Sequence, residues 1–200
     1  MPYAYHFTEA VRSEIAAVPW ERTPNYVDPH AEYPWRPWHH TQFGGSPIPI
    51  CLDPAAGQFS HTRLYLGPSH AELGEIDHPA VDGIVNLCEL DDPWELEEDD
   101  RRWPRGEGSF GYTWEKLDDD ARDVAALLRA GKTVLIHCMA GVNRSTTLTC
   151  AVLLHIEGIS ADAALRRVQR FHPPTHPEDR HWQALRQLAI ALRAEKDAHS

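Results

Sequence analysis

The chain has 200 residues, 42% of them hydrophobic and 24% charged, which suits one globular domain with a full core or one domain plus an extension. Its formal net charge of -11 repels nucleic acid and anionic membrane, so we expect neither as a general partner. The longest apolar runs, such as Ala189 to Leu192, are too short to span a bilayer, and residues 1–10 show no secretory signal.

The first part of the chain, residues 1–60, differs in composition from the rest. It is rich in proline and carries Trp20, Trp35 and Trp38, with little hydrophobic periodicity. Dense proline prevents long helices, although Glu9 to Val18 could form one short helix. Because disordered tails are poor in large aromatic residues, we predict an irregular arm that packs against the domain.

From residue 61 to residue 195 the pattern is that of one α/β domain. Arg63 to Leu66 predicts a short strand and Val81 to Leu87 a buried strand, with a helical turn near His70 to Leu73 between them. Asp91 to Arg102 predicts an acidic, solvated loop.

The second half of this domain alternates helices with one strand. Lys132 to His137 predicts an apolar strand, and Arg144 to Glu157 predicts a helix that ends at Gly158. Ser160 caps a further helix, and Pro177 opens the last one. Apolar residues at helical spacing mark the helix before the strand and the last helix; they are Leu117, Ala121, Val124, Leu128, Trp182, Leu185, Leu188 and Leu192. Such alternation predicts a mainly parallel central sheet flanked by helices on both sides.

One segment, Val134 to Ser145, carries the strongest chemical signal. A buried strand runs into a loop and a helix starts directly after it, which aims backbone N–H groups and a helix N-terminus at one point, where a phosphate dianion fits. Cys138 at the base of this loop would be held as a thiolate. Gly141 permits a tight turn, and we expect Asn143 to adopt a positive φ. Arg144 can donate two parallel hydrogen bonds to two phosphate oxygens.

Further roles follow from the positions around this loop. Ser145 can donate a hydrogen bond to Cys138, and His137 is expected to orient the loop through its ring. The residues whose backbone or side chain would bind phosphate are Met139, Ala140, Gly141, Val142, Asn143 and Arg144.

The motif His-Cys-x-x-Gly-x-x-Arg-Ser at His137 to Ser145 resembles the signature of the protein tyrosine phosphatase superfamily, and Gly-Val-Asn-Arg-Ser looks like its dual-specificity branch. Arg63 to Gly67 and Gly83 to Leu87 resemble two further strands of these domains, so the likeness covers residues 61–190. It implies hydrolysis through a phosphocysteine on Cys138, without a metal or other cofactor.

The resemblance also calls for a general acid on a loop before the cysteine. Trp103-Pro-Arg-Gly-Glu107-Gly108 resembles the Trp-Pro-x-x-Asp-Gly pattern of related bacterial members, with Glu107 in place of aspartate. The alternatives are Asp118, Asp119 and Asp120, whose other interpretation is a solvated helix face.

The four cysteines form no Cys-x-x-Cys pair, so we expect neither a zinc site nor a disulfide framework, and a reducing cytoplasm is the natural location. Cys88 ends a strand that neighbours the catalytic strand in this family, so it could form a disulfide with Cys138 on oxidation; equally, it could be a small buried residue. Cys150, inside a helix, is expected in the core.

The substrate is predicted from the charge of the loop. Residues 139–143 contain no lysine or arginine, and the chain is acidic, which favours phosphotyrosine, with phosphoserine or phosphothreonine also open, over polyanions. Two other functions compete with a protein phosphatase. One is a phosphatase of small molecules such as phosphoinositides, sugar phosphates or nucleotides; the other is a catalytically weak phospho-binding module that has lost its acid. His172 to His176 could line the rim of the site.

Overall fold

A computed structural model describes residues 5, 7–19, 48–50, 63–67, 81–87, 101–102, 113–138 and 141–199. The strands in this part of the chain form one five-stranded sheet in the order β1-β2-β5-β3-β4. Their bounds are Ile48–Ile50 (β1), Leu64–Gly67 (β2), Gly83–Asn86 (β3), Arg101–Arg102 (β4) and Val134–His137 (β5). β1 pairs antiparallel with β2, and every other neighbouring pair is parallel, which confirms the mainly parallel sheet.

The central strand β5 lies between β2 and β3, and its residues are all buried, as its run of apolar residues predicted. The register pairs His137 with Gly67 on β2 and with Asn86 on β3. The carboxyl ends of these three strands therefore coincide at one edge of the sheet, which is where open α/β sheets place their ligands.

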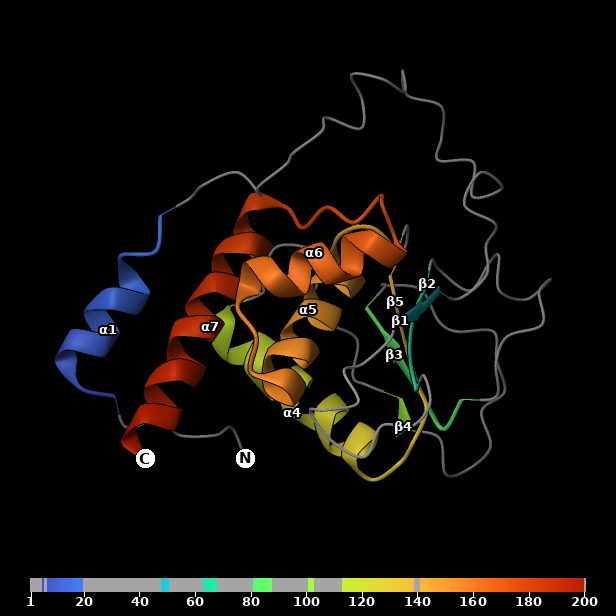
Figure 1. Cartoon of the computed structure of the whole chain (residues 1–200), viewed down its shortest axis with the longest axis horizontal. Coiled ribbons are helices and arrows are strands. Elements are labelled where there is room, and N and C mark those ends of the chain that lie inside the picture. The colour runs from blue at the N-terminus through green and yellow to red at the C-terminus, as the bar shows by residue number, and fades with distance from the viewer. Residues whose placement is uncertain are drawn as a thin grey trace, which may run out of the picture.

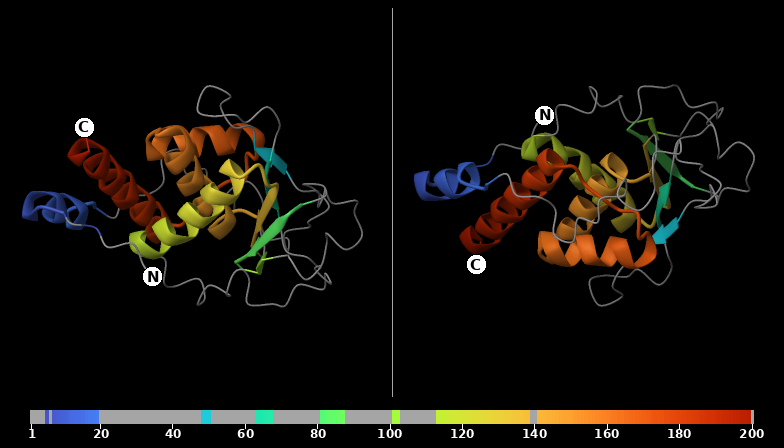
Figure 2. Two further views of the ribbon diagram at one scale, coloured as in Figure 1. Left: turned by 90° about the horizontal axis from the view of Figure 1, so that it is seen from below. Right: turned by 90° about the horizontal axis from the view of Figure 1, so that it is seen from above.

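The described helices are α1 (Glu9–Ala16), α4 (Trp114–Arg129), α5 (Arg144–Glu157), α6 (Ala161–Phe171) and α7 (Asp179–Ala198). Figure 1 shows α5 between the sheet and α7, with α1 outermost against α7. All of these helices lie on one side of the sheet (Figure 2). Helices on the second face of the sheet therefore stay a prediction.

α5 is the central helix of the core, because residues 145–154 are all buried. It contacts β2 and β5 of the sheet as well as α4, α6 and α7. The predicted stop at Gly158 is confirmed: its φ of 64° is left-handed, and its N–H donates to the Leu154 carbonyl at 3.0 Å. The predicted cap at Ser160 is also confirmed, since its side chain accepts from Ala163 N at 3.3 Å.

Some boundaries differ from the sequence-based prediction. α7 begins at Asp179 with Glu178 as N-cap, two residues after the predicted Pro177. β4 (Arg101–Arg102) lies at the end of the stretch predicted as a loop, and β1 lies within the segment predicted to be irregular. Both are short edge strands, which carry little hydrophobic periodicity. Trp20, Trp35, Trp38 and the predicted turn near residues 70–73 lie outside the described residues.

The predicted N-terminal helix is confirmed as α1, and it packs on α7. Ile15 and Val18 are buried, and their carbonyl oxygens accept hydrogen bonds from Gln187 (3.0 Å) and Gln183 (2.8 Å) of α7. This part of the arm therefore packs against the domain. No helix in the described part of the chain is both long and apolar enough to cross a membrane.

Candidate active site

The site is built at the carboxyl end of β5, where the chain passes into α5. Cys138 follows β5 directly and is 3% exposed. Ser145 lies in the first turn of α5 and is fully buried, and its Oγ is 3.2 Å from Cys138 Sγ. The strand, the loop and the helix thus bring together a thiol and a hydroxyl that are seven residues apart.

Arg144, the first residue of α5, is half-buried beside this pair. Its Nη1 donates to the carbonyl oxygen of Leu87, just after β3, at 2.6 Å, and Leu87 N in turn donates to His137 O at 2.9 Å. The end of β3 therefore holds both the guanidinium and the start of the loop. A guanidinium has five N–H donors, so one bond to Leu87 leaves others for phosphate oxygens.

The backbone of the loop agrees with prediction at Gly141 and differs at Asn143. Gly141 has φ 69°, a left-handed conformation that favours glycine. Asn143 has φ −113°, so the predicted positive φ is wrong. The asparagine side chain is used instead: its Oδ1 accepts from Glu178 N at 2.9 Å and lies 2.6 Å from His181 Nδ1.

Carbonyl groups of the loop are bound on its outer side. Val142 O accepts from His176 N at 2.8 Å and from Thr146 Oγ1 at 2.6 Å, and the Gly141 carbonyl is hydrogen-bonded to His172. In a trans peptide the C=O and the next N–H point in opposite directions. The N–H groups of Val142 and Asn143 therefore point away from His172 and His176, which bind the preceding carbonyl groups.

Two buried histidines lie behind the loop. Burial lowers the pKa of His181 to about 4, with a further lowering from the positive charge of Arg144. Burial also lowers the pKa of His172, partly offset by its hydrogen bond to Gly141. The sequence suggested that His172 to His176 could line the rim of the site. In the structure this segment contacts the loop, through His172 at Gly141 and through His176 at Val142. Nothing in the sequence linked His181 to Asn143, because 38 residues separate them.

His137 and Cys150 are both buried in the core. His137 is fully buried, and its predicted role in orienting the loop stays a prediction. Cys150 is fully buried inside α5, as predicted, and burial raises the pKa of its thiol, which keeps it protonated and unreactive. Four other predicted site residues lie outside the described part of the chain: Met139, Ala140, Glu107 and Cys88.

The acidic start of α4 is not the solvated face that the sequence predicted. Asp118 is 1% exposed and Asp120 5%, while Asp119 is half-buried. Asp120 is paired with Lys116, and burial raises its pKa.

Asp118 is the centre of a buried polar network. It accepts from Arg122 Nε and Tyr5 Oη, both at 2.8 Å, and its other oxygen is 2.9 Å from His155 Nε2. Burial acts to raise the pKa of Asp118, but these three hydrogen bonds outweigh burial and lower it. His155 is eleven residues beyond Arg144 in α5, roughly 16 Å along the helix axis at about 1.5 Å per residue, so this network is remote from the loop.

No group of three histidine, cysteine or acidic side chains that could hold a metal occurs among the residues that the structure describes. The groups gathered at the site are a thiol, a hydroxyl, a guanidinium and the N-terminus of α5. Together they can bind a tetrahedral dianion and attack its central atom.

The chain is similar to several known phosphatases. Residues 111–190 match the family described as "Dual specificity phosphatase, catalytic domain". The chain is 39% identical over 64 residues to the dual specificity protein phosphatase Mpk3 of Drosophila melanogaster, covering 32% of this chain and 16% of that protein. It is 30% identical over 156 residues to the human protein phosphatase Slingshot homolog 3, covering 74% of this chain and 22% of that protein. The chain thus spans less than a quarter of either relative.

Among solved structures, the crystal structure of Tk-PTP in the active form is similar, with a TM-score of 0.52 and 29% identity. The match covers 67% of this chain and 96% of that one. The fold is therefore the α/β fold of dual-specificity phosphatases, and the matches support the dual-specificity branch of the protein tyrosine phosphatase superfamily.

Proposed function

We propose that this chain, whose residues 111–190 match the dual-specificity phosphatase family, is a cysteine-dependent phosphatase that hydrolyses phosphomonoesters through a phosphocysteine intermediate. The observation that carries the proposal is the contact between Cys138 Sγ and Ser145 Oγ, 3.2 Å apart at the start of α5. Arg144 directly precedes Ser145 and is the first residue of the helix.

In the first step, the Cys138 thiolate attacks phosphorus, an S–P bond forms and the bond from phosphorus to the leaving oxygen breaks. Arg144 and the backbone amides at the start of α5 hold the charge on the equatorial oxygens. A general acid gives a proton to the leaving oxygen.

In the second step, water attacks phosphorus and the S–P bond breaks, with its electron pair returning to sulfur. The conjugate base of the acid takes the proton of the attacking water. Ser145 Oγ, 3.2 Å from the sulfur, donates a hydrogen bond to the departing thiolate.

We propose Glu107 as the general acid, because the sequence from Trp103 to Gly108 resembles the acid-bearing loop of related bacterial phosphatases. On the same pattern we propose that the chain is of the bacterial type. The surroundings of two of the three competing carboxylates, Asp118 and Asp120, support Glu107. Asp118 is engaged by Tyr5, Arg122 and His155, the last of which lies far along α5 from the loop. Asp120 is paired with Lys116.

Protein phosphotyrosine is the proposed substrate class, with phosphoserine and phosphothreonine as further substrates. The support is the absence of lysine and arginine from residues 139–143 and the net charge of -11, both of which disfavour polyanionic substrates. The proposed compartment is the reducing cytoplasm, where the thiol of Cys138 stays available.

A redox role for Cys88 also belongs to this proposal. β3 and β5 run parallel and in register up to Asn86 and His137, and Leu87 N donates to His137 O at 2.9 Å. In this register Leu87 is opposite Cys138, and Cys88 is the next residue in the sequence. On this closeness we propose a disulfide between Cys88 and Cys138 on oxidation.

A substrate panel run on wild type beside Cys138→Ser tests the proposal. The panel contains phosphotyrosine and phosphoserine peptides, an inositol phosphate, a sugar phosphate and p-nitrophenyl phosphate. We expect turnover of the phosphopeptides, its loss in Cys138→Ser with vanadate still bound, and full turnover in the control Cys150→Ala. Hydrolysis by Cys138→Ser at near the wild-type rate would refute the mechanism. A preference for the inositol or sugar phosphate would refute the substrate class, and binding without turnover would indicate a phospho-binding module.

A further inference from the structure

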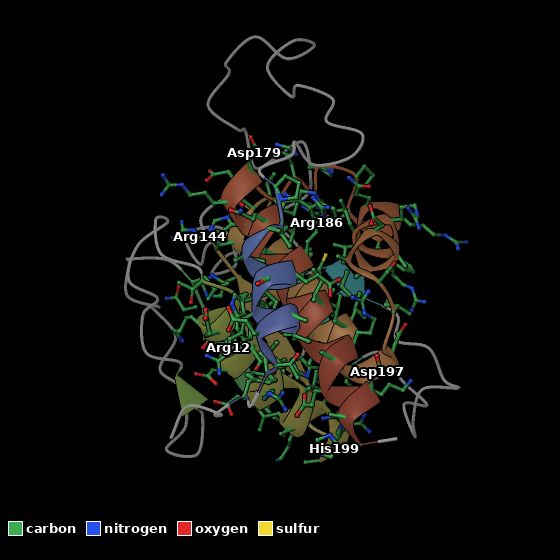
Figure 3. All side chains as sticks on the ribbon, turned by 90° about the vertical axis from the view of Figure 1, so that its left-hand side faces the viewer. Arg12, Arg144, Asp179, Arg186, Asp197 and His199 are labelled. Carbon is green, nitrogen blue, oxygen red and sulfur yellow. The ribbon has the colours of Figure 1, made fainter. Side chains whose placement is uncertain are left out.

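The connection between α6 and α7, residues 172–178, and the first turn of α7 lie along the outer side of the phosphate loop, here defined as residues 138–144. His176 N donates to Val142 O at 2.8 Å, Glu178 N donates to Asn143 Oδ1 at 2.9 Å, and His181 Nδ1 is 2.6 Å from the same oxygen. Figure 3 shows Asp179, at the start of α7, toward the same end of the molecule as Arg144, with Asp197 and His199 at the other end of the helix.

Asn143 connects the phosphate loop to α7 through its side chain. It is the N-cap residue of α5, a position where asparagine normally accepts a hydrogen bond from the first turn of its own helix. Here the side chain makes no such cap and instead faces Glu178 and His181. The amides in the first turn of α5 are therefore not covered by the side chain that would usually cap them, and they stay available to a phosphate.

The protonation of His181 follows from its partner. Asn143 Oδ1 already accepts the backbone N–H of Glu178, so the atom facing His181 is an oxygen, and His181 Nδ1 must donate. The ring is 1% exposed. Because burial and the charge of Arg144 lower its pKa to about 4, it is neutral near pH 7 and adds no second positive charge beside Arg144.

Arg144 follows Asn143 directly, so the position of one sets the position of the other. The Arg144 guanidinium lies 2.6 Å from Leu87 O. The backbone of Arg144 is held in place because the side chain of the preceding residue, Asn143, is bonded to His181. These contacts fix Arg144 relative to the end of β3 and the start of α7. Since misplacement by about 1 Å can cost roughly 100-fold in rate, a contact outside the substrate pocket can matter for catalysis.

We infer that His181 and Asn143 are positioning residues of the phosphate loop, and that the hydrogen bond between them keeps Arg144 and the α5 amides in the geometry that binds the phosphoryl group. The inference rests on the proposed phosphatase function. Because neither residue is the proposed proton donor to the leaving group, losing the bond should affect all phosphomonoesters alike.

The test compares three substitutions at His181 that differ in where they place a donor. Asn carries its amide nitrogen at the position of Nδ1, Gln carries it near the position of Nε2, and Ala has none. We expect His181→Ala and His181→Gln to lower kcat/KM about 10- to 100-fold, equally for p-nitrophenyl phosphate and an alkyl phosphate, and to weaken vanadate binding. His181→Asn should recover most of the loss.

Two further variants control for folding. Gln183→Ala removes a hydrogen bond of the same helix to Val18 O, away from the loop, and should leave turnover unchanged. Asn143→Ala removes the acceptor of both His181 Nδ1 and Glu178 N without replacing a residue of α7. It therefore tests the contact between α7 and the loop even if His181→Ala does not fold, and it should reproduce the loss.

Unchanged kcat/KM in Asn143→Ala or in folded His181→Ala, or equal losses in His181→Asn and His181→Gln, would overturn the inference. The proposed function would survive either result as long as Cys138→Ser is inactive. Full activity of Cys138→Ser would instead remove the function on which the inference rests.

Discussion

The buried network around Asp118 leads to a prediction that separates stability from catalysis. Asp118→Ala removes the acceptor of three side chains at once: Arg122, Tyr5 and His155. Arg122 keeps its bond to Glu195 at 2.9 Å, so the charge is not wholly uncompensated. The substitution nevertheless leaves a partly buried guanidinium without its main partner.

Breaking a buried ion pair from one side typically costs about 3–5 kcal/mol of unfolding free energy, because the remaining charge is left without compensation. For a chain of 200 residues, each kcal/mol lowers Tm by roughly 2–4 °C, so a fall in Tm of about 6–20 °C is expected. Asp118→Asn keeps the size and one acceptor oxygen, and should cost about 1.5–3 kcal/mol.

The pH dependence has a defined sign. The folded protein holds the pKa of Asp118 below its usual value of 3.8, so the carboxylate stabilises the fold above that pH. The difference between wild type and Asp118→Ala should be complete at neutral pH. It should shrink as the pH falls below 3.8 and through the still lower pKa of the folded state.

Urea unfolding from neutral to acidic pH measures this difference, with the half-buried Asp119→Ala as the matched control, expected to change stability by less than about 0.5 kcal/mol. In folded Asp118→Ala, turnover of both aryl and alkyl phosphates should equal that of wild type, because the network is remote from the loop. Destabilisation below about 1 kcal/mol would refute the energetic reasoning. A selective loss of about 10²- to 10⁴-fold on alkyl phosphates would make Asp118 the general acid.

Three further predictions concern the site itself. Arg144→Lys should lower kcat strongly in steady-state assays, because lysine is a point charge and cannot replace two parallel donors to the equatorial oxygens; unchanged kinetics would remove Arg144 from the site. Glu107→Gln should reduce turnover of alkyl phosphates by about 10²- to 10⁴-fold, far more than of p-nitrophenyl phosphate, and should flatten the basic limb of the kcat profile; equal small losses on both substrates would contradict the assignment. Mild peroxide should give a Cys88–Cys138 disulfide that thiol reductants reverse, detectable by peptide mass mapping; over-oxidised Cys138 with Cys88 still a thiol would argue against it.

The local elements of this fold were predictable because their signals lie within one turn or one strand. The apolar run of β5 predicted a buried central strand, and Ser160 and Gly158 predicted the start of α6 and the end of α5. The nine-residue motif from His137 to Ser145 contains the strand end, the loop and the helix start, so the approach of Ser145 to Cys138 could also be read from the sequence. Gly141 belongs to the same group, since a tight turn there favours glycine.

What the sequence could not reveal depends on partners that are far apart along the chain. Asp118 looked like part of a solvated acidic face, yet it is buried because Tyr5, 113 residues away, and His155 supply its hydrogen bonds. Asn143 was expected to serve through its backbone, yet its side chain bonds His181, 38 residues later. The sequence around an aspartate or asparagine looks the same whether its side chain hydrogen-bonds to solvent or to a residue of a distant helix. Only the packing of α4, α5 and α7 around one core decides which of the two occurs, because burial forces each polar group to find a partner.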